Sequence, residues 1–149
     1  MQIVGKAHAR AFEFRKATKD HYSQRLTLPA HEAEPAVVSA QLKLPFEPVD
    51  FHTTTIADLV SECEIDHAIG PVPHTVGGST AGYQRWNRFM HRGLSRYARV
   101  RNDALLDGVS RMSAYLHHGM VSPQRVAREA AESNSDGAQK YLDELLIWR

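Results

Sequence analysis

Two short segments in the last third of the chain contain the residues best suited to chemistry. Ser110 and Ser113 stand at the predicted start of a helix, where hydroxyl groups and unpaired backbone N–H groups can bind a phosphate. Glu144 and Trp148 lie four residues apart in a second predicted helix, so their side chains share one face. A carboxylate beside an indole can bind a flat heterocycle, accepting hydrogen bonds from its edge while the ring stacks on its face.

Both pairs also have a purely structural interpretation. Ser110 can act only as the N-cap of its own helix, with Ser113 facing solvent. Trp148 can belong to a hydrophobic core while Glu144 is exposed. On the residues alone, these alternatives stay open.

A row of arginines precedes these segments. Its spacings of 3, 4, 4 and 3 residues predict one stripe of guanidinium groups along a helix, formed by Arg85, Arg88, Arg92, Arg96 and Arg99. Residues 85–111 contain seven arginines and two aspartates, although the whole chain has a formal net charge of only +1. Such a stripe suits phosphate contacts. The alternative is a solvated face whose arginines lie over neighbouring apolar side chains.

The segment from Gly119 to Arg128 allows a different function. A glycine turn, a serine cap and a helix with Gln124, Arg125 and Arg128 near its start also resembles the second half of a helix-turn-helix. In that case the chain would be a non-catalytic helical DNA-binding module. The nine histidines show no spacing typical of a zinc site, so we predict no metal.

Length and composition fit one ordinary intracellular domain. The 149 residues are 42% hydrophobic, close to the globular average. Cys63 is the only cysteine, which excludes an internal disulfide, and we expect it to be a small buried hydrophobe. No apolar run approaches the roughly 20 residues of a membrane-spanning helix, and no signal peptide is present. We therefore predict a cytoplasmic protein without a membrane partner.

The elements that must position these residues are predicted to be helices. No segment alternates as a strand does, so the expected fold is mainly α. The signals predict helices over residues 7–26, 56–62, 79–100 and 110–118, a helix opened by Ser122 and Pro123, and a last one from residue 138. Thr54 or Thr55 caps the second. The apolar face of the longest comprises Trp86, Phe89, Met90, Leu94, Tyr97 and Val100.

Prolines at positions 29, 35, 45 and 48 predict an extended connector between two parts of the chain. The expected organisation is therefore a helical part at residues 1–30, a connector with a short helix at 31–66, and a helical domain at 67–149. The last helix reaches Arg149 without a C-cap, so we expect an internal fragment of a longer protein.

Three segments in this order resemble class II cyclobutane pyrimidine dimer photolyases: Tyr97 to Asp103, Ser110 to Pro123, and Leu142 to Arg149. The resemblance covers most of residues 67–149, which would be the N-terminal part of the family's helical FAD-binding domain. Residues 1–30 look like the tail of its N-terminal α/β antenna domain. The four-residue step from Glu144 to Trp148 agrees with class II, whereas other classes use three.

The resemblance implies a light-dependent lyase that repairs pyrimidine dimers in DNA by electron transfer from reduced FAD, with an antenna chromophore of unspecified type. The implied FAD contacts are Tyr97, Val109, Ser110, Arg111, Met112 and Ser113. The implied DNA contacts are Arg101, Glu144, Trp148 and Arg149. Of these, Glu144 and Trp148 would be catalytic, the carboxylate by stabilising the dimer radical anion and the indole by packing on the extruded dimer.

Some residues depart from the family pattern. Val109 replaces the hydroxyl residue found there in other photolyase classes, which removes one phosphate donor. The rest of the family's flavin cavity is formed by later residues, so the remainder of its own chain would be needed to complete it. We therefore expect this piece alone to be inactive, with weak FAD affinity. A cryptochrome-type light sensor is the alternative within the family.

Overall fold

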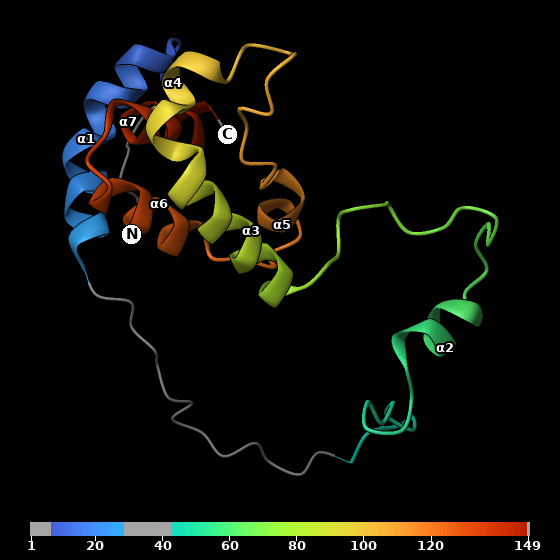
Figure 1. Cartoon of the computed structure of the whole chain (residues 1–149). Helices are drawn as coiled ribbons and strands as arrows, with labels where there is room; N and C mark the ends of the chain where they lie inside the picture. Colours follow the sequence, from blue (N-terminus) through green and yellow to red (C-terminus); the bar gives the residue numbers. More distant parts are fainter. Residues whose placement is uncertain (1–6, 29–42, 149) are drawn as a thin grey trace. The chain divides into compact units, whose positions relative to one another are not determined.

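The computed structural model describes residues 7–28 and 43–148 (Figure 1). The chain divides into two compact units, one formed by residues 1–31 together with 76–149, and the other by residues 32–75. All regular elements in the described ranges are helical, and no strand occurs in them. The prediction of a mainly α chain is therefore confirmed for this part of the sequence.

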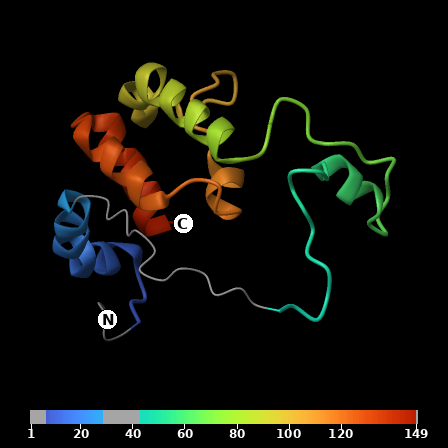
Figure 2. The same ribbon diagram turned by 90° about the horizontal axis from the view of Figure 1, so that it is seen from below.

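The larger unit contains most of the helices. In chain order they are α1 (Ala11–Thr27), α3 (Ser79–Arg92), η1 (Leu94–Arg96), α4 (Tyr97–Val100), α5 (Ser113–His117), α6 (Pro123–Glu132), α7 (Asp136–Asp143) and a π-helical turn, η2 (Glu144–Trp148). Figures 1 and 2 show α6 and α7 between α1 on one side and α3 with α4 on the other. Helix α7, which contacts α4, α6 and η1, therefore lies at the centre of this unit.

The core of the larger unit is aromatic. Trp86 is fully buried and donates from Nε1 to Glu129 Oε2 at 2.6 Å. Its ring lies 5.4 Å from that of Tyr141, which also contacts Phe89 and Tyr97. Four of the six residues on the predicted apolar face are buried, and the remaining two, at positions 90 and 100, are half-buried. The 3.6-residue pattern therefore identified the correct face.

The predicted single helix over residues 79–100 is wrong, because it breaks at Gly93. The Gly93 N–H caps the Phe89 carbonyl at 2.8 Å, and a Cβ at Gly93 would lie 2.6 Å from the Phe89 ring. The ring fills the space that a side chain would need, and glycine ends the helix there. A short 3-10 turn then redirects the chain into α4.

One helix start agrees with the sequence prediction, and two others differ from it. Ser122 caps α6 through a hydrogen bond from the Arg125 N–H, with Pro123 in the first turn, as expected. The helix predicted over residues 110–118 begins later, at Ser113, because Arg111 adopts a left-handed backbone with φ 53°. The last helix begins earlier than predicted, at Asp136, because Ser135 accepts from the Ala138 N–H and caps it.

The apolar face expected for helix α1 is only partly the one that packs. The 3.6-residue period predicts an apolar side formed by Ala11, Phe12, Ala17, Tyr22 and Leu26. Positions 11, 22 and 26 are half-buried, whereas position 17 is exposed, Phe12 is 56% exposed, and the buried residue is Thr18. Two hydrogen bonds hold the helix to the end of the chain: Arg15 Nε donates to Asp143 at 2.7 Å, and the Tyr22 hydroxyl donates to the Leu146 carbonyl at 3.0 Å.

The smaller unit has one described helix, α2 (Ile56–Ser61). Thr55 caps it in a reciprocal capping box with Asp58, which confirms one of the two proposed caps. Among its described residues, 43–75, none is buried. Cys63 is exposed, so the expectation of a buried cysteine is wrong. The prolines at positions 29 and 35 lie outside the described residues.

Candidate functional site

A cavity of about 550 Å³ brings together residues from three separate segments of the larger unit. We call it the serine–glutamate cavity. Its lining combines hydroxyl groups, one carboxylate and aromatic rings, contributed by Tyr97, Ser110, Met112, Ser113, Ala114, Leu116, His117, Tyr141, Glu144 and Leu145. The sequence placed Ser110 and Glu144 in separate motifs, and the fold puts both in the wall of one hollow.

Tyr97 forms the aromatic part of the wall. It is the first residue of α4, and its ring meets those of Phe89 and Tyr141 edge-on at 5.8 and 5.3 Å. Burial raises the pKa of the Tyr97 hydroxyl above its usual 10.0, and the negative charge of Glu144 raises it further. Tyr97 is therefore a neutral hydrogen-bonding group over the physiological pH range.

The serines approach from the segment before α5. The Ser110 hydroxyl accepts from the Met112 N–H at 3.4 Å and lies 3.5 Å from the Tyr141 hydroxyl. Ser113, the first residue of α5, is exposed. The first-turn N–H groups of a helix have no acceptor within it. Ser110 and Ser113 therefore put two hydroxyl groups on this side of the cavity.

Glu144 forms the charged side of the cavity, at the junction of α7 and η2. Its Oε1 pairs with Lys140 at 2.9 Å and with Arg101 at 3.1 Å. The hydrogen bond to Glu144 raises the pKa of the Lys140 ammonium. With its side chain 29% exposed, the carboxylate is held by two cations and still accessible from the cavity.

Trp148 does not line this cavity. It is 60% exposed, and its Nε1 donates to Asp143 Oδ2 at 3.3 Å. It borders a separate hollow beside Ile147 and Phe14. The structure therefore separates the indole from Glu144, although the two residues are four positions apart. Arg149, the other predicted DNA contact at this end, lies outside the described residues.

Val109 and Arg111 line a different hollow. This second cavity, of about 190 Å³, also contains Ser110 and four arginines of the predicted row, Arg85, Arg88, Arg92 and Arg96. We call it the arginine cavity. Arg99, the fifth member, is exposed on α4 and does not line it. Of the predicted FAD contacts, Tyr97, Ser110, Met112 and Ser113 thus share the serine–glutamate cavity, and Ser110 borders both.

The residues suggested for base reading are partly engaged within the fold. Arg125 pairs with Glu129 at 2.7 Å, and its guanidinium stacks on the Tyr83 ring at 4.2 Å from the centroid. Arg128 is half-buried, while Gln124 is exposed. The helix before the turn, α5, has only five residues. These contacts favour packing over base reading for this segment.

Two residues of the site were missed by sequence reasoning. Tyr141 lines the serine–glutamate cavity and contacts the Ser110 hydroxyl, and Lys140 holds Glu144. The four-residue spacing between Lys140 and Glu144 is a signal for the ion pair. Tyr141 has the matching signal, because it precedes Glu144 by three positions and so faces the same side.

Within residues 7–28 and 43–148, no group of three or more histidine, cysteine or acidic side chains is arranged to hold a metal ion. None of the helices in those ranges is long and apolar enough to cross a membrane.

Comparison with known proteins connects the chain to one named activity. No family model matches it. A deoxyribodipyrimidine photo-lyase of Methanothermobacter thermautotrophicus is 33% identical over 73 residues, which is 49% of this chain and 16% of that protein. Proteins of the same name from two strains of Thermus thermophilus are 35% identical over 88 residues, 59% of this chain and 21% of theirs. The chain thus spans about a fifth or less of these relatives, and the partial matches support a relationship to the photolyase family.

Proposed function

We propose that this chain is a segment of a class II deoxyribodipyrimidine photo-lyase, which repairs pyrimidine dimers in DNA by light-driven electron transfer. One observation carries the proposal: Tyr97, Ser110, Ser113 and Glu144 line a single cavity. They come from the three segments in which the chain resembles photolyases. The partial sequence matches to proteins of that name support the same function independently.

The serine–glutamate cavity fits part of an FAD molecule. Its volume of about 550 Å³ lies within the range of small-molecule sites, roughly 300–1,000 Å³. Ser110, Ser113 and the first-turn N–H groups of α5 would hold phosphate oxygens, while Tyr97 supplies an aromatic surface. Reduced FAD, when bound, supplies the electron that light transfers to the dimer. Val109 and Arg111 would act from the adjoining cavity.

Glu144 would act on the lesion. Fixed by Arg101 and Lys140, the carboxylate would accept hydrogen bonds from N–H groups on the dimer edge, and the two paired cations would supply the positive charge that stabilises charge developing on a nearby carbonyl. Arg101 would also reach a DNA phosphate. Trp148 would pack on the extruded dimer, and its 60% exposure leaves the indole available for stacking. Arg149 would contact DNA beside it.

The segment would need the rest of a longer protein. The matches cover 16% and 21% of the relatives, so most of the length of these relatives corresponds to nothing here. We propose that residues 67–149 begin the FAD-binding domain, that residues 31–66 connect it to an antenna domain, and that residues 1–30 end that domain. The segment alone would be inactive in repair.

Flavin binding provides the first test. Titration of the 149-residue chain against FAD, followed by fluorescence anisotropy, should give weak binding that falls about tenfold in the double variant Ser110→Ala/Ser113→Ala, which removes two hydrogen-bond donors. The matched control is Ser23→Ala/Ser95→Ala, which removes two exposed hydroxyls outside the cavity. Equal loss of affinity in both double variants would contradict the assignment.

Repair provides the second test, in the protein made from the complete reading frame. Glu144→Ala should reduce dimer repair under blue light by about 10-fold or more, as expected for loss of a preorganised electrostatic contact. Flavin absorbance should be retained, because the flavin contacts come from other residues. Loss of bound flavin in this variant would show that Glu144 belongs to the cofactor site instead. Glu144→Gln, which keeps a hydrogen-bonding side chain of similar size, should retain more activity.

A further inference from the structure

A larger cavity lies between α1, α6 and η2, and we call it the α1–α6 cavity. None of its lining residues is assigned to the flavin or to the lesion. Its volume is about 690 Å³, which exceeds that of the serine–glutamate cavity and lies within the roughly 300–1,000 Å³ of small-molecule sites. The α1–α6 cavity is therefore large enough for a ligand of its own.

The walls of the α1–α6 cavity are mainly apolar. Leu26 of α1, Ala127 of α6, and Leu145 and Leu146 of η2 contribute aliphatic side chains, and Phe14 of α1 contributes an aromatic ring. Each apolar group of a ligand that is buried against such walls stabilises the complex in proportion to the area removed from water. The walls therefore favour a ligand with an apolar part.

The two hydroxyl groups in the lining are already bound within the fold. The Thr18 hydroxyl donates to the Phe14 carbonyl at 2.8 Å, and the Tyr22 hydroxyl donates to the Leu146 carbonyl at 3.0 Å. A sugar or a nucleoside would lose hydrogen bonds to water on entering this part of the cavity without gaining enough new ones. The lining therefore favours a hydrocarbon chain over a polyhydroxylated ligand.

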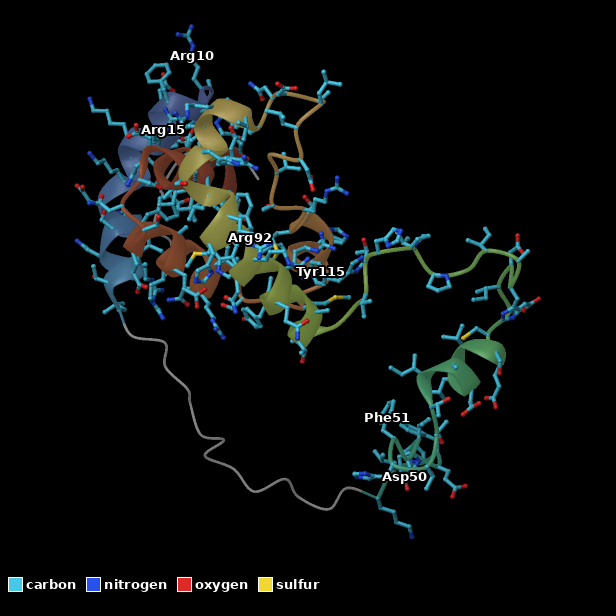
Figure 3. All side chains as sticks on the ribbon, viewed as in Figure 1. Arg10, Arg15, Asp50, Phe51, Arg92 and Tyr115 are labelled. Atoms are coloured by element: carbon cyan, nitrogen blue, oxygen red, sulfur yellow. The ribbon has the colours of Figure 1, made fainter. Side chains whose placement is uncertain are left out.

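Two basic side chains border the α1–α6 cavity without a partner in an ion pair. His21 and Arg25 stand four positions apart on α1 and so share one side of the helix. Within residues 7–28 and 43–148, neither forms an ion pair, and no acidic side chain lines the cavity. By contrast, Arg15 of the same helix, labelled in Figure 3, pairs with Asp143. The fold thus uses Arg15 and leaves His21 and Arg25 available to an anion.

The start of α6 adds to the preference for negative charge. Pro123 and Gln124 are the first two residues of this ten-residue helix, and both line the cavity. The N-terminus of a helix carries a partial positive charge, which attracts anions. Since arginine and carboxylate groups match in geometry as well as in charge, a carboxylate is the anion that suits Arg25 best.

The size of the cavity favours a flexible chain over a helix of a partner protein. From Phe14 to Leu26, α1 extends about 18 Å at 1.5 Å per residue. A helix about 10 Å in diameter and equally long would occupy roughly 1,400 Å³, about twice the volume of the cavity. An extended hydrocarbon chain is much thinner and fits the same length.

We propose that the α1–α6 cavity binds an amphipathic carboxylate of the fatty-acid class. The hydrocarbon chain lies against Phe14, Leu26 and the two leucines of η2, and the carboxylate is bound by Arg25 and His21. This site goes beyond the proposed repair function, because it shares no residue with the assigned flavin and lesion contacts.

Isothermal titration calorimetry of the 149-residue chain with dodecanoate tests the proposal. Saturable binding to one site is expected, and decanoate should bind up to about 15-fold more weakly, because it lacks two CH₂ groups. Dodecyltrimethylammonium, which has the same chain and the opposite charge, should bind at least about tenfold more weakly than dodecanoate. Absence of saturable dodecanoate binding, or equal affinity for the two head groups, would overturn the proposal.

A pair of double variants locates the carboxylate. His21→Gln/Arg25→Gln should weaken dodecanoate binding about tenfold, because it removes the charge-assisted hydrogen bonds. The matched control is Arg10→Gln/His91→Gln, which changes the same residue types at exposed positions outside the cavity, and Figure 3 shows Arg10 extending away from the unit. The control should change the affinity by less than about twofold, since distant exposed charges are screened by salt. Equal losses in both variants would show that only overall charge matters.

Sedimentation analysis distinguishes a small ligand from a second copy of the chain. The proposal expects a monomer both with and without dodecanoate. A dimer that dodecanoate dissociates, and that His21→Gln/Arg25→Gln also dissociates, would show that another copy occupies the cavity and would contradict the proposal. Because no flavin and no DNA are present in these measurements, their failure leaves the repair proposal untouched.

Discussion

The two units of this chain form helices by different means. In the larger unit, helices surround a buried aromatic cluster that includes Trp86, Phe89 and Tyr141. In the smaller unit, residues 43–75 bury no side chain, and Ile56 and Phe51 are more than 70% exposed. Helix α2 is instead fixed at its start by the capping box of Thr55 and Asp58.

The comparison separates tertiary from local stabilisation. Burial of aromatic side chains stabilises the larger unit by an amount that grows with apolar area, so its helices depend on one another. A six-residue helix has little stability of its own, and a cap adds to it without linking it to other elements. Substitutions in the larger unit should therefore affect the whole unit, and those in the smaller one should act only locally.

The largest effect is expected at Gly137, where α7 meets η1. Helix propensity alone predicts that Gly137→Ala stabilises the protein by about 1 kcal/mol. Packing predicts the opposite, because a Cβ would overlap with the Leu94 carbonyl oxygen and lie 2.8 Å from the Ser95 oxygen. Backbone atoms cannot move aside as a flexible side chain can, so we expect a net loss of about 3 kcal/mol or more.

Thermal unfolding followed by far-UV circular dichroism measures this change. The control is Gly70→Ala in the smaller unit, where a Cβ would meet nothing within 4 Å. That variant should unfold within the error of the parent chain. A more stable Gly137→Ala protein would mean that α7 and η1 are not packed closely in solution.

A smaller but still global effect is expected at Trp86. The substitution Trp86→Phe removes part of a fully buried ring and the hydrogen bond to Glu129, leaving Oε2 of that carboxylate without its donor. Together these losses should reduce the free energy of unfolding by about 2 kcal/mol.

A double-mutant cycle with Glu129→Ala, measured by urea denaturation, isolates the hydrogen bond. A coupling energy of about 1.5 kcal/mol between the two positions is expected for a bond to a charged group. Additive effects would indicate that the Trp86 ring, and not its N–H, accounts for the whole loss.

The smallest effect is expected at Asp58. Hydrogen bonds from the Thr55 hydroxyl and backbone N–H hold the pKa of this carboxyl below its usual 3.8. A lowered pKa in the folded state means that the cap is fully formed above about pH 4 and is lost as pH falls through the lowered value. Thr55→Val should raise the pKa toward 3.8, because it removes the first of these donors.

NMR titration of the α2 amides measures the Asp58 pKa directly. The backbone amide of Leu94, in the other unit, should show no step at the pKa of Asp58. A simultaneous change in both signals would contradict the view that the cap acts locally.

Helix starts that depend on a local capping signal were predicted correctly at two places. Ser122 with Pro123 and Thr55 gave correct helix starts, because a cap depends only on residues three or four positions away. The break at Gly93 could not be predicted, since it depends on where the Phe89 ring packs. The face of α1 was predicted only in part for the same reason: Thr18 is buried by its neighbours and not by its own hydrophobicity.

The candidate site shows the same division. The sequence indicated Ser110 and Glu144 as chemical residues from their types, but their placement in one cavity depends on how α7 packs against α4. The arginine row was visible as a spacing, whereas the break at Gly93 decides that Arg96 lines the cavity and Arg99 does not. Tyr141 lines the cavity because it is close to Ser110, with which it is hydrogen-bonded, and only three positions before Glu144.

The hydrogen bonds from α1 to residues 143 and 146 join two parts of the larger unit that are far apart in the sequence. Tyr22 and Leu146 are 124 positions apart, yet they are hydrogen-bonded in one unit, so the smaller unit is an insertion between two halves of the larger one. A cut within residues 43–75 would separate the polypeptide into two pieces without removing a buried contact. The halves would then be a split protein, suited to reassembly from separately expressed parts.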